Sequence, residues 1–129
     1  MRFIVDTHTF LWAVLSPERL TDRVRGLFTD SDVELLISIA TPWEMAIKAG
    51  IGKLRNGAEI LDDFENRVAA SGYQILGASI KHMIRSGYLP RHHKDPFDRL
   101  LIAQALDLNI PILSGDEIFD LYGVQRVWK

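Results

Sequence analysis

Four acidic residues of this chain could do chemistry together, namely Asp6, Glu44, Asp98 and Asp116. Asp6 directly follows the hydrophobic residues 3–5, and Asp116 follows another hydrophobic run after a Ser-Gly pair. Glu44 and Asp98 stand near the start of two segments whose apolar residues recur at helical spacing. In an open parallel sheet, ligands bind beyond the carboxyl ends of the strands, so acids from these distant stretches can meet there.

Each acid also has a simpler explanation as part of a helix start. Asp6 could cap the helix that follows it, and residues 41–44, Thr-Pro-Trp-Glu, have the layout of a capping box. Residues 95–98, Asp-Pro-Phe-Asp, repeat that layout with an aspartate as the cap. Asp116 could lie in the first turn of a short helix. Taken singly, each acid is better explained by capping than by catalysis.

Taken together, the four acids indicate a metal site. Like charges at neighbouring helix starts repel one another, so such a cluster is costly unless a bound cation neutralises it or the groups are spread apart. Ligands that are all oxygen favour Mg²⁺ or Mn²⁺. The chain has no cysteine, and His92 and His93 have no second histidine at a suitable spacing for zinc, so neither is expected to bind the metal.

The segments that must position these acids predict an α/β fold. Short aliphatic runs indicate buried strands at residues 2–6, 34–38 and 110–114, with a further short strand at 73–76 and an edge strand at 123–128. Apolar residues at helical spacing predict helices at 9–15, 21–29, 42–49, 58–70, 79–86 and 96–106. Their alternation indicates a mostly parallel central sheet flanked by helices. Without a linker or a repeat, residues 1–129 are expected to form one domain.

The bulk composition excludes several classes of protein. Hydrophobic residues make up 47% of the chain and the net charge is only −2, which argues against disorder. No apolar run approaches the ~20 residues that cross a bilayer, and Asp6 and His8 interrupt the N-terminal run, as they would not in a signal peptide. The lack of cysteine suits a reducing compartment. We therefore expect a cytoplasmic protein that does not contact a membrane.

Contact with nucleic acid would have to come from local basic stretches, because the whole chain is slightly acidic. The most basic stretch is residues 85–94, which also holds two histidines and a tyrosine and runs directly into Asp95. It could hold phosphates and stack a base, and it could equally be a solvated loop with incidental charge. A second patch surrounds Lys48. The candidates for RNA contact are Arg91, Lys94, Lys48 and Lys53.

Four segments of the sequence resemble the motifs of PIN-domain ribonucleases, in particular the VapC-type toxins of bacterial toxin–antitoxin pairs. These segments are residues 3–12, 38–45, 93–105 (in the Asp-Pro-Phe-Asp variant) and 113–119, and they follow the family's order and spacing. The resemblance implies a PIN fold and Mg²⁺- or Mn²⁺-dependent hydrolysis of RNA phosphodiester bonds. It also implies inhibition by a cognate antitoxin protein, and a homodimer.

The resemblance assigns Asp6, Glu44, Asp98 and Asp116 as the catalytic, metal-binding acids. Asp95 is either an additional ligand or only the cap of the helix that carries Asp98, and we favour the cap. Thr7 and Ser114 are hydroxyls that could support the acids from behind, although ordinary capping explains both equally well. In this interpretation, metal-bound water attacks the phosphodiester, and the sequence does not show which carboxylate takes its proton.

Two other functions are compatible with parts of the pattern. A phosphatase with an aspartyl nucleophile could place Asp6 after a strand, but such enzymes need a second acid two residues later, where this chain has His8. A non-catalytic RNA- or protein-binding domain could keep the same fold. Retention of all four acids argues against that, because a domain that only binds gains little from their mutual repulsion. Metal-dependent RNA cleavage would separate these alternatives.

Overall fold

Five parallel strands form one sheet in the computed structural model, which describes residues 1–129. The order across the sheet is β3-β2-β1-β4-β5, so β1 is central and β3 and β5 are the edges. The bounds of the strands are β1 (Arg2–Val5), β2 (Glu34–Ser38), β3 (Tyr73–Leu76), β4 (Ile112–Leu113) and β5 (Arg126–Val127). All four neighbouring pairs are parallel, which confirms the predicted fold class.

Successive residues of the central strands point to two cores on opposite faces of the sheet, as the pleat of a strand requires. Phe3 and Val5 of β1 belong to one core, together with Leu113 of β4. Ile4, between them, belongs to the other core, with Ile112. Both faces are therefore covered, which explains why these strands appear in the sequence as unbroken aliphatic runs.

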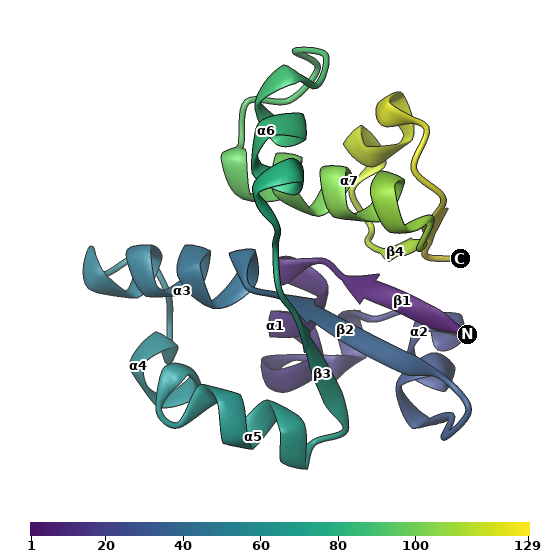
Figure 1. Cartoon of the computed structure of the whole chain (residues 1–129). Coiled ribbons are helices and arrows are strands. Elements are labelled where there is room, and N and C mark those ends of the chain that lie inside the picture. Colours follow the sequence, from purple (N-terminus) through teal and green to yellow (C-terminus); the bar gives the residue numbers. More distant parts are fainter.

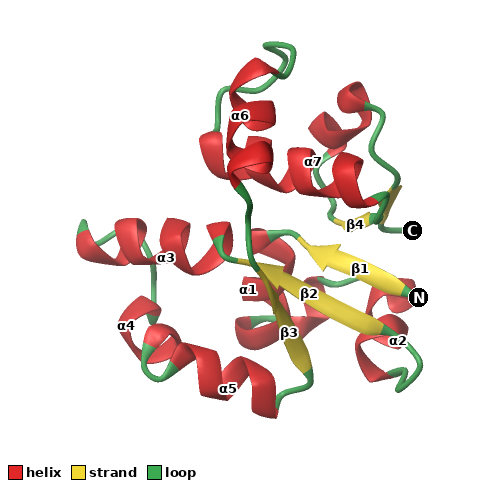
Figure 2. Ribbon diagram, viewed as in Figure 1, coloured by secondary structure: helices red, strands yellow, loops and turns green.

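Helices cover both faces of this sheet (Figures 1 and 2). Helix α7 lies over one face, with α6 packed on α7, and α1, α2 and α5 lie on the opposite face. The bounds of the helices are α1 (Thr7–Leu15), α2 (Asp22–Thr29), α3 (Ala40–Gly50), α4 (Gly57–Leu61), α5 (Phe64–Ala70), α6 (Ile80–Tyr88) and α7 (Pro96–Leu108), with 3₁₀ helices η1 (Pro17–Arg19) and η2 (Glu117–Tyr122). None of them has the length and apolar character that would let a helix cross a membrane.

The structure corrects two of the predicted strands and one predicted helix. The strand predicted at 110–114 is regular only over β4, because Pro111 has no N–H to donate, although its carbonyl accepts from Ile4 N at 2.9 Å. The edge strand at 123–128 shrinks to β5. The helix predicted at 58–70 is broken into α4 and α5, because Asp63 adopts a left-handed conformation with φ 49°. Aspartate tolerates that conformation and is a poor helix former.

The capping box predicted at residues 41–44 is also wrong. Helix α3 begins at Ala40, one residue before Thr41, and the Ala40 N–H donates to the Ser38 side chain at 3.1 Å. Thr41 is fully buried, and its hydroxyl pairs with that of Thr7 at 3.0 Å. The threonine thus joins the starts of α1 and α3 instead of capping its own helix.

Candidate functional site

Asp6 lies at the junction of β1 and α1, only 3% exposed. It occupies the N-cap position of α1, but its side chain makes no capping hydrogen bond. Its Oδ2 instead accepts a hydrogen bond from Ser114 Oγ at 2.9 Å, across the end of the neighbouring strand β4. The other oxygen, Oδ1, is buried and has no hydrogen-bond partner. The Asp6 carboxylate therefore lies at the carboxyl edge of the sheet and does not cap α1.

Glu44 projects from the second turn of α3 and is 1% exposed. Its Oε2 pairs with Lys48 Nζ at 2.5 Å, one helical turn further on, whereas its Oε1 is buried without a partner. Burial alone would lower the pKa of Lys48, but the hydrogen bond and the charge of Glu44 outweigh it and raise the pKa, with help from Asp95 and Asp98. Lys48 thus lies among the acids.

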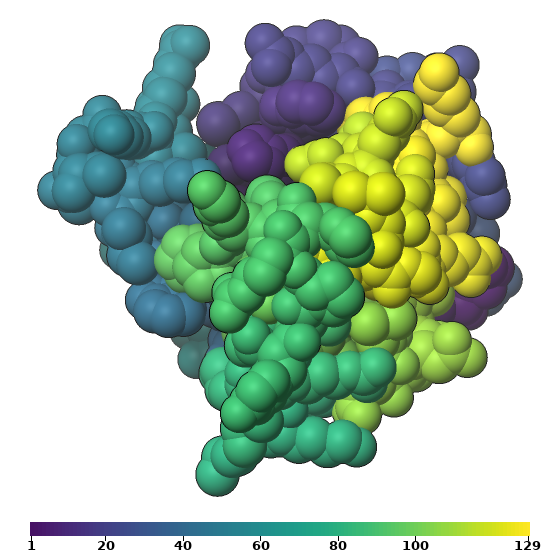
Figure 3. Space-filling view, turned by 90° about the horizontal axis from the view of Figure 1, so that it is seen from above, coloured from purple at the N-terminus to yellow at the C-terminus, as the bar shows by residue number.

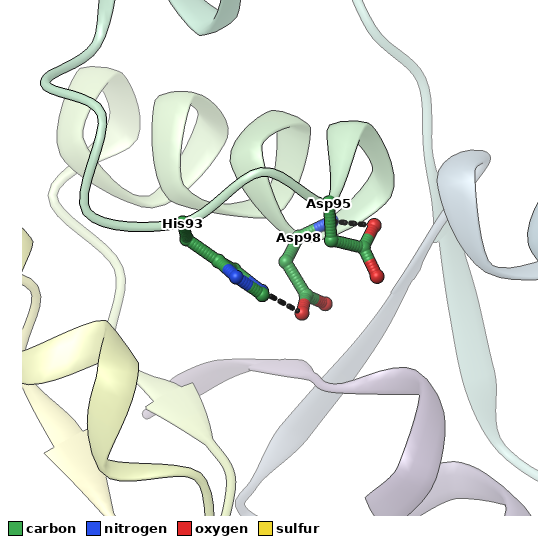
Figure 4. Close-up of side chains that lie close together, drawn as sticks. All are labelled: His93, Asp95 and Asp98. Atoms are coloured by element: carbon green, nitrogen blue, oxygen red, sulfur yellow. Dashed lines mark hydrogen bonds and ion pairs between the residues drawn. The ribbon is translucent and has the colours of Figure 1, made fainter.

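Asp98 stands in the first turn of α7, next to Asp95 and His93 (Figure 4). His93 Nε2 lies 2.7 Å from Asp98 Oδ2, and ligand atoms of all three residues lie within 4.8 Å of one another. Asp95 Oδ1 accepts from the backbone N–H groups of residues 97 and 98, which confirms Asp95 as the helix cap. The spacing of the histidines gave no reason to place His93 at a metal site, because its partner is the carboxylate of Asp98 and not a second histidine.

Asp116 is the most exposed of the four acids. Its Oδ1 caps η2 by accepting from the Ile118 N–H at 3.0 Å, and its own N–H donates to Ser114 Oγ at 3.0 Å. The Ser114 hydroxyl therefore joins Asp116 to Asp6. Thr7, the other hydroxyl singled out from the sequence, hydrogen-bonds only to Thr41 and to none of the acids.

The acids interact electrostatically with one another at the carboxyl edge of the sheet. Burial raises the pKa of Asp6, and the charges of Glu44 and Asp116 add to that rise, although the hydrogen bond from Ser114 and the charge of His8 oppose it. Burial, followed by the charge of Asp6, raises the pKa of Asp98 to about 7, although the His93 hydrogen bond opposes that rise. The structure thus brings all four predicted acids to one place, at a cost in free energy.

A cation fits this place. The two buried oxygens without partners, Asp6 Oδ1 and Glu44 Oε1, belong to acids at the β1–α1 junction and in helix α3. Unpaired buried carboxylate oxygens are costly, and oxygen-only ligands suit a hard divalent ion. No ammonium reaches Asp6, since Lys48 pairs only with Glu44. Asp6 and Glu44 therefore offer free oxygens to a metal.

The remaining basic residues singled out from the sequence lie outside this cluster. Arg91 and Lys94 are exposed on the loop between α6 and α7, and Lys53 is exposed after α3. The first part of the basic stretch, residues 85–88, is helical and belongs to α6. The loop that follows is held by protein contacts and is therefore ordered, unlike a freely solvated loop.

A buried arginine and a tyrosine hold this loop. Arg99 is 4% exposed and has no carboxylate partner, yet its guanidinium donates to the carbonyls of residues 86, 87, 89, 90 and 93 at 2.8–3.3 Å. Tyr122 Oη donates to the carbonyl of Pro90 at 2.7 Å and accepts from the His93 N–H at 2.8 Å. Both backbone groups of His93 are thereby fixed, and its ring is held against Asp98.

The raised pKa of Asp98 predicts how the stability of the metal-free protein depends on pH. Between the ordinary value of 3.8 and the folded value of about 7, the folded chain holds a proton that the unfolded chain has released. Unfolding free energy must then fall as pH rises through this window, by up to roughly 4 kcal/mol. Urea unfolding in EDTA at pH 4 to 8 measures it. Asp98→Asn should remove this fall, and equal slopes for both proteins would contradict the prediction.

Comparison with known proteins agrees with the fold described above. The PIN domain model matches residues 3–124, nearly the whole chain. No curated protein sequence matches. Among solved structures, the fold resembles a chain of VapBC2 from Rickettsia felis bound to promoter DNA, with TM-score 0.71, 16% identity and all of both chains covered. It also resembles a chain of VapBC-1 from nontypeable Haemophilus influenzae, with TM-score 0.68, 17% identity and 98% and 97% of the two chains covered.

A third similar structure is a chain of FitAB bound to the IR36 DNA fragment, with TM-score 0.67, 18% identity and 98% and 94% of the chains covered. At these identities the structural likeness concerns the fold, whereas the family match rests on the sequence. Both agree with the parallel α/β fold of this chain. Because the family model spans residues 3–124 and the fold agrees, this chain belongs to the PIN domain family.

Proposed function

We propose that this chain is an endoribonuclease that hydrolyses RNA phosphodiester bonds with Mg²⁺ or Mn²⁺, held by Asp6, Glu44, Asp98 and Asp116. One observation carries the proposal: two buried carboxylate oxygens, from Asp6 and from Glu44, lack hydrogen-bond donors, and two more carboxylates lie close to them. A domain that only bound RNA or protein would gain nothing from burying unpaired charge. Asp95 uses Oδ1 to cap helix α7, and its Oδ2 would be a further ligand of the metal.

Each residue of the site then has a defined task. The metal would supply a Lewis acid for the scissile phosphate and lower the pKa of a bound water. Ser114 holds Asp6 through Oδ2 and so leaves Oδ1 for the metal. His93 holds Asp98 in the same way, through Oδ2. Lys48, the one ammonium within the cluster, balances Glu44 and can turn to a phosphate oxygen when RNA binds.

Exposed basic residues beside the cluster would hold the RNA backbone. Arg91 and Lys94 lie on the ordered loop that leads into α7, and Lys48 and Lys53 lie on and just after α3. Because the whole chain carries a net charge of −2, attraction for RNA must come from such a local patch.

We further propose that the protein is a cytoplasmic toxin, that an antitoxin protein neutralises it and that it forms a homodimer. Three of the similar folds come from VapBC and FitAB complexes. The outer face of α6 carries apolar side chains with no partner in this chain, including Ile80, Ile84 and Tyr88, which are 57–87% exposed. Such a contiguous apolar face is typical of a surface that another protein chain covers.

Chelation tests the metal-dependent nuclease directly. We expect cleavage of a labelled single-stranded RNA to fall at least 100-fold in EDTA and to return with Mg²⁺ or Mn²⁺, since the carboxylates alone offer no activated water. Melting temperature should rise with Mg²⁺ in the same samples, by an amount equivalent to about 2.7 kcal/mol at 100 times the Kd. Cleavage that persists in EDTA would rule the proposal out.

A further inference from the structure

A hollow of about 360 Å³ adjoins the acid cluster, between α1 and the residues that follow β4 and β5. Asp6 and Asp116 form the side that the hollow shares with the cluster, and Trp12 and Trp128 contribute aromatic surface. His8, which is exposed, contributes a polar ring. Figure 3 shows the N-terminal segment, in purple, at the surface beside the yellow C-terminal segment.

The two indoles are held in place by the rest of the protein. Their ring centroids lie 5.9 Å apart at an interplanar angle of 54°, and the guanidinium of Arg19 lies 5.6 Å from the Trp12 centroid. The Trp128 ring lies so close to Gly115 that a Cβ at that position would come within 3.0 Å of it. The Trp128 carbonyl also accepts from the Thr21 hydroxyl. The aromatic surface is therefore formed before any ligand arrives.

The chemistry of this hollow matches an unpaired nucleobase. A base has two apolar faces that stack on aromatic rings, and polar edges that hydrogen-bond. The hollow offers indole surface for the faces, and the exposed His8 ring for the edges. Because Asp6 and Asp116 line both the hollow and the acid cluster, the hollow lies next to the phosphate that the cluster would hold. Only a sugar separates this phosphate from the base of the adjoining nucleotide.

We propose that this hollow binds an unpaired nucleobase of single-stranded RNA beside the scissile phosphate, with Trp12 and Trp128 as its stacking surfaces. The inference rests on the proposed ribonuclease function and adds a base-binding subsite to it. Bases inside an intact duplex are stacked on one another and cannot enter the hollow. Single-stranded substrate is therefore preferred, and the base at this position contributes to the choice of cleavage site.

Tryptophan fluorescence tests the subsite without requiring cleavage. The chain has three tryptophans, and Trp43 packs on Phe97 outside the hollow, so Trp43→Phe leaves only Trp12 and Trp128 to report. With Mg²⁺ present, nucleoside 5′-monophosphates should quench this emission, whereas ribose 5-phosphate, which lacks a base, should not. Equal effects of both probes would overturn the proposal. So would quenching by arginine amide but not by nucleotides, because it would mark a protein-binding pocket.

A cleavage assay with abasic RNA gives an independent readout. Removing the base beside the cleavage site should lower kcat/KM roughly 5- to 150-fold for the wild type, because stacking on an aromatic side chain contributes about 1–3 kcal/mol. Trp128→Leu should cause a similar loss on intact RNA and little further loss on abasic RNA, whereas Trp128→Phe should retain most activity. If the losses caused by Trp128→Leu and by removal of the base simply add, the base does not stack on Trp128 and the subsite is refuted, while the nuclease assignment stands. Base-dependent quenching in a protein that cleaves no RNA would refute only the nuclease.

Discussion

Asp6→Asn should yield a folded protein that has lost at least about 100-fold of its RNA cleavage. Asparagine keeps the shape of the side chain and can still accept the Ser114 hydrogen bond, but it removes the charge that would hold the metal. Even residues that only support metal ligands change metal affinity or activity by roughly 10- to 100-fold, so loss of a ligand must cost more. Initial rates on labelled RNA at saturating Mg²⁺ measure the effect.

The same substitution should stabilise the protein in EDTA. Burial and the charges of Glu44 and Asp116 penalise the Asp6 carboxylate, and a neutral amide escapes most of that penalty. The matched control is Asp62→Asn, which removes an exposed acid between α4 and α5. It should change neither the rate of RNA cleavage nor the free energy of unfolding. Full cleavage by Asp6→Asn would disprove the proposed metal site, and simple misfolding would appear as a lower melting temperature in EDTA.

Arg99→Met should lower the free energy of unfolding by about 3–5 kcal/mol, more than the other substitutions proposed for this protein. Methionine fills much of the space but donates no hydrogen bond, so the five carbonyls around the guanidinium lose their donor. Each buried carbonyl left unpaired costs roughly 1–3 kcal/mol, and water can reach only some of them. Urea unfolding at fixed pH in EDTA gives the free energy.

Arg99→Lys separates charge from geometry. Lysine keeps the positive charge, but a single ammonium has only three donors and cannot span five carbonyls, so it should recover less than half of the loss. Arg85→Met, on the exposed surface of α6, serves as the control and should be nearly neutral. If Arg99→Met were equally mild, the loop would be held by other contacts, and Tyr122 would be the next residue to test.

The parts of the fold that follow from local pattern were predictable. Buried strands appear as aliphatic runs, and parallel strands bring their carboxyl ends to one edge, so the meeting of Asp6, Glu44 and Asp116 followed from topology. The cap at Asp95 was predictable because an N-cap bonds within its own helix. These features depend on residues close in sequence or on the general geometry of α/β sheets.

The features that were missed depend on contacts between distant residues. Thr41 lies in a sequence that is typical of a helix cap, but it is buried where α1 meets α3, and its hydroxyl hydrogen-bonds to that of Thr7. Asp63 ends a helix that its neighbours favour, and no strong breaker marks the place. His93 was predicted only as part of a basic stretch, because nothing in its spacing shows that Arg99 and Tyr122 would bring it to a carboxylate.

The central position of β1 has a consequence for how the protein is made. Asp6 leaves the ribosome early, but Ser114, which orients it, is translated 108 residues later, and β4 closes the open edge of β1 at the same late stage. Until then a nascent chain holds β1 against β2 only and lacks Asp116. The proposed metal site therefore cannot be complete until residue 116 has been translated, long after Asp6.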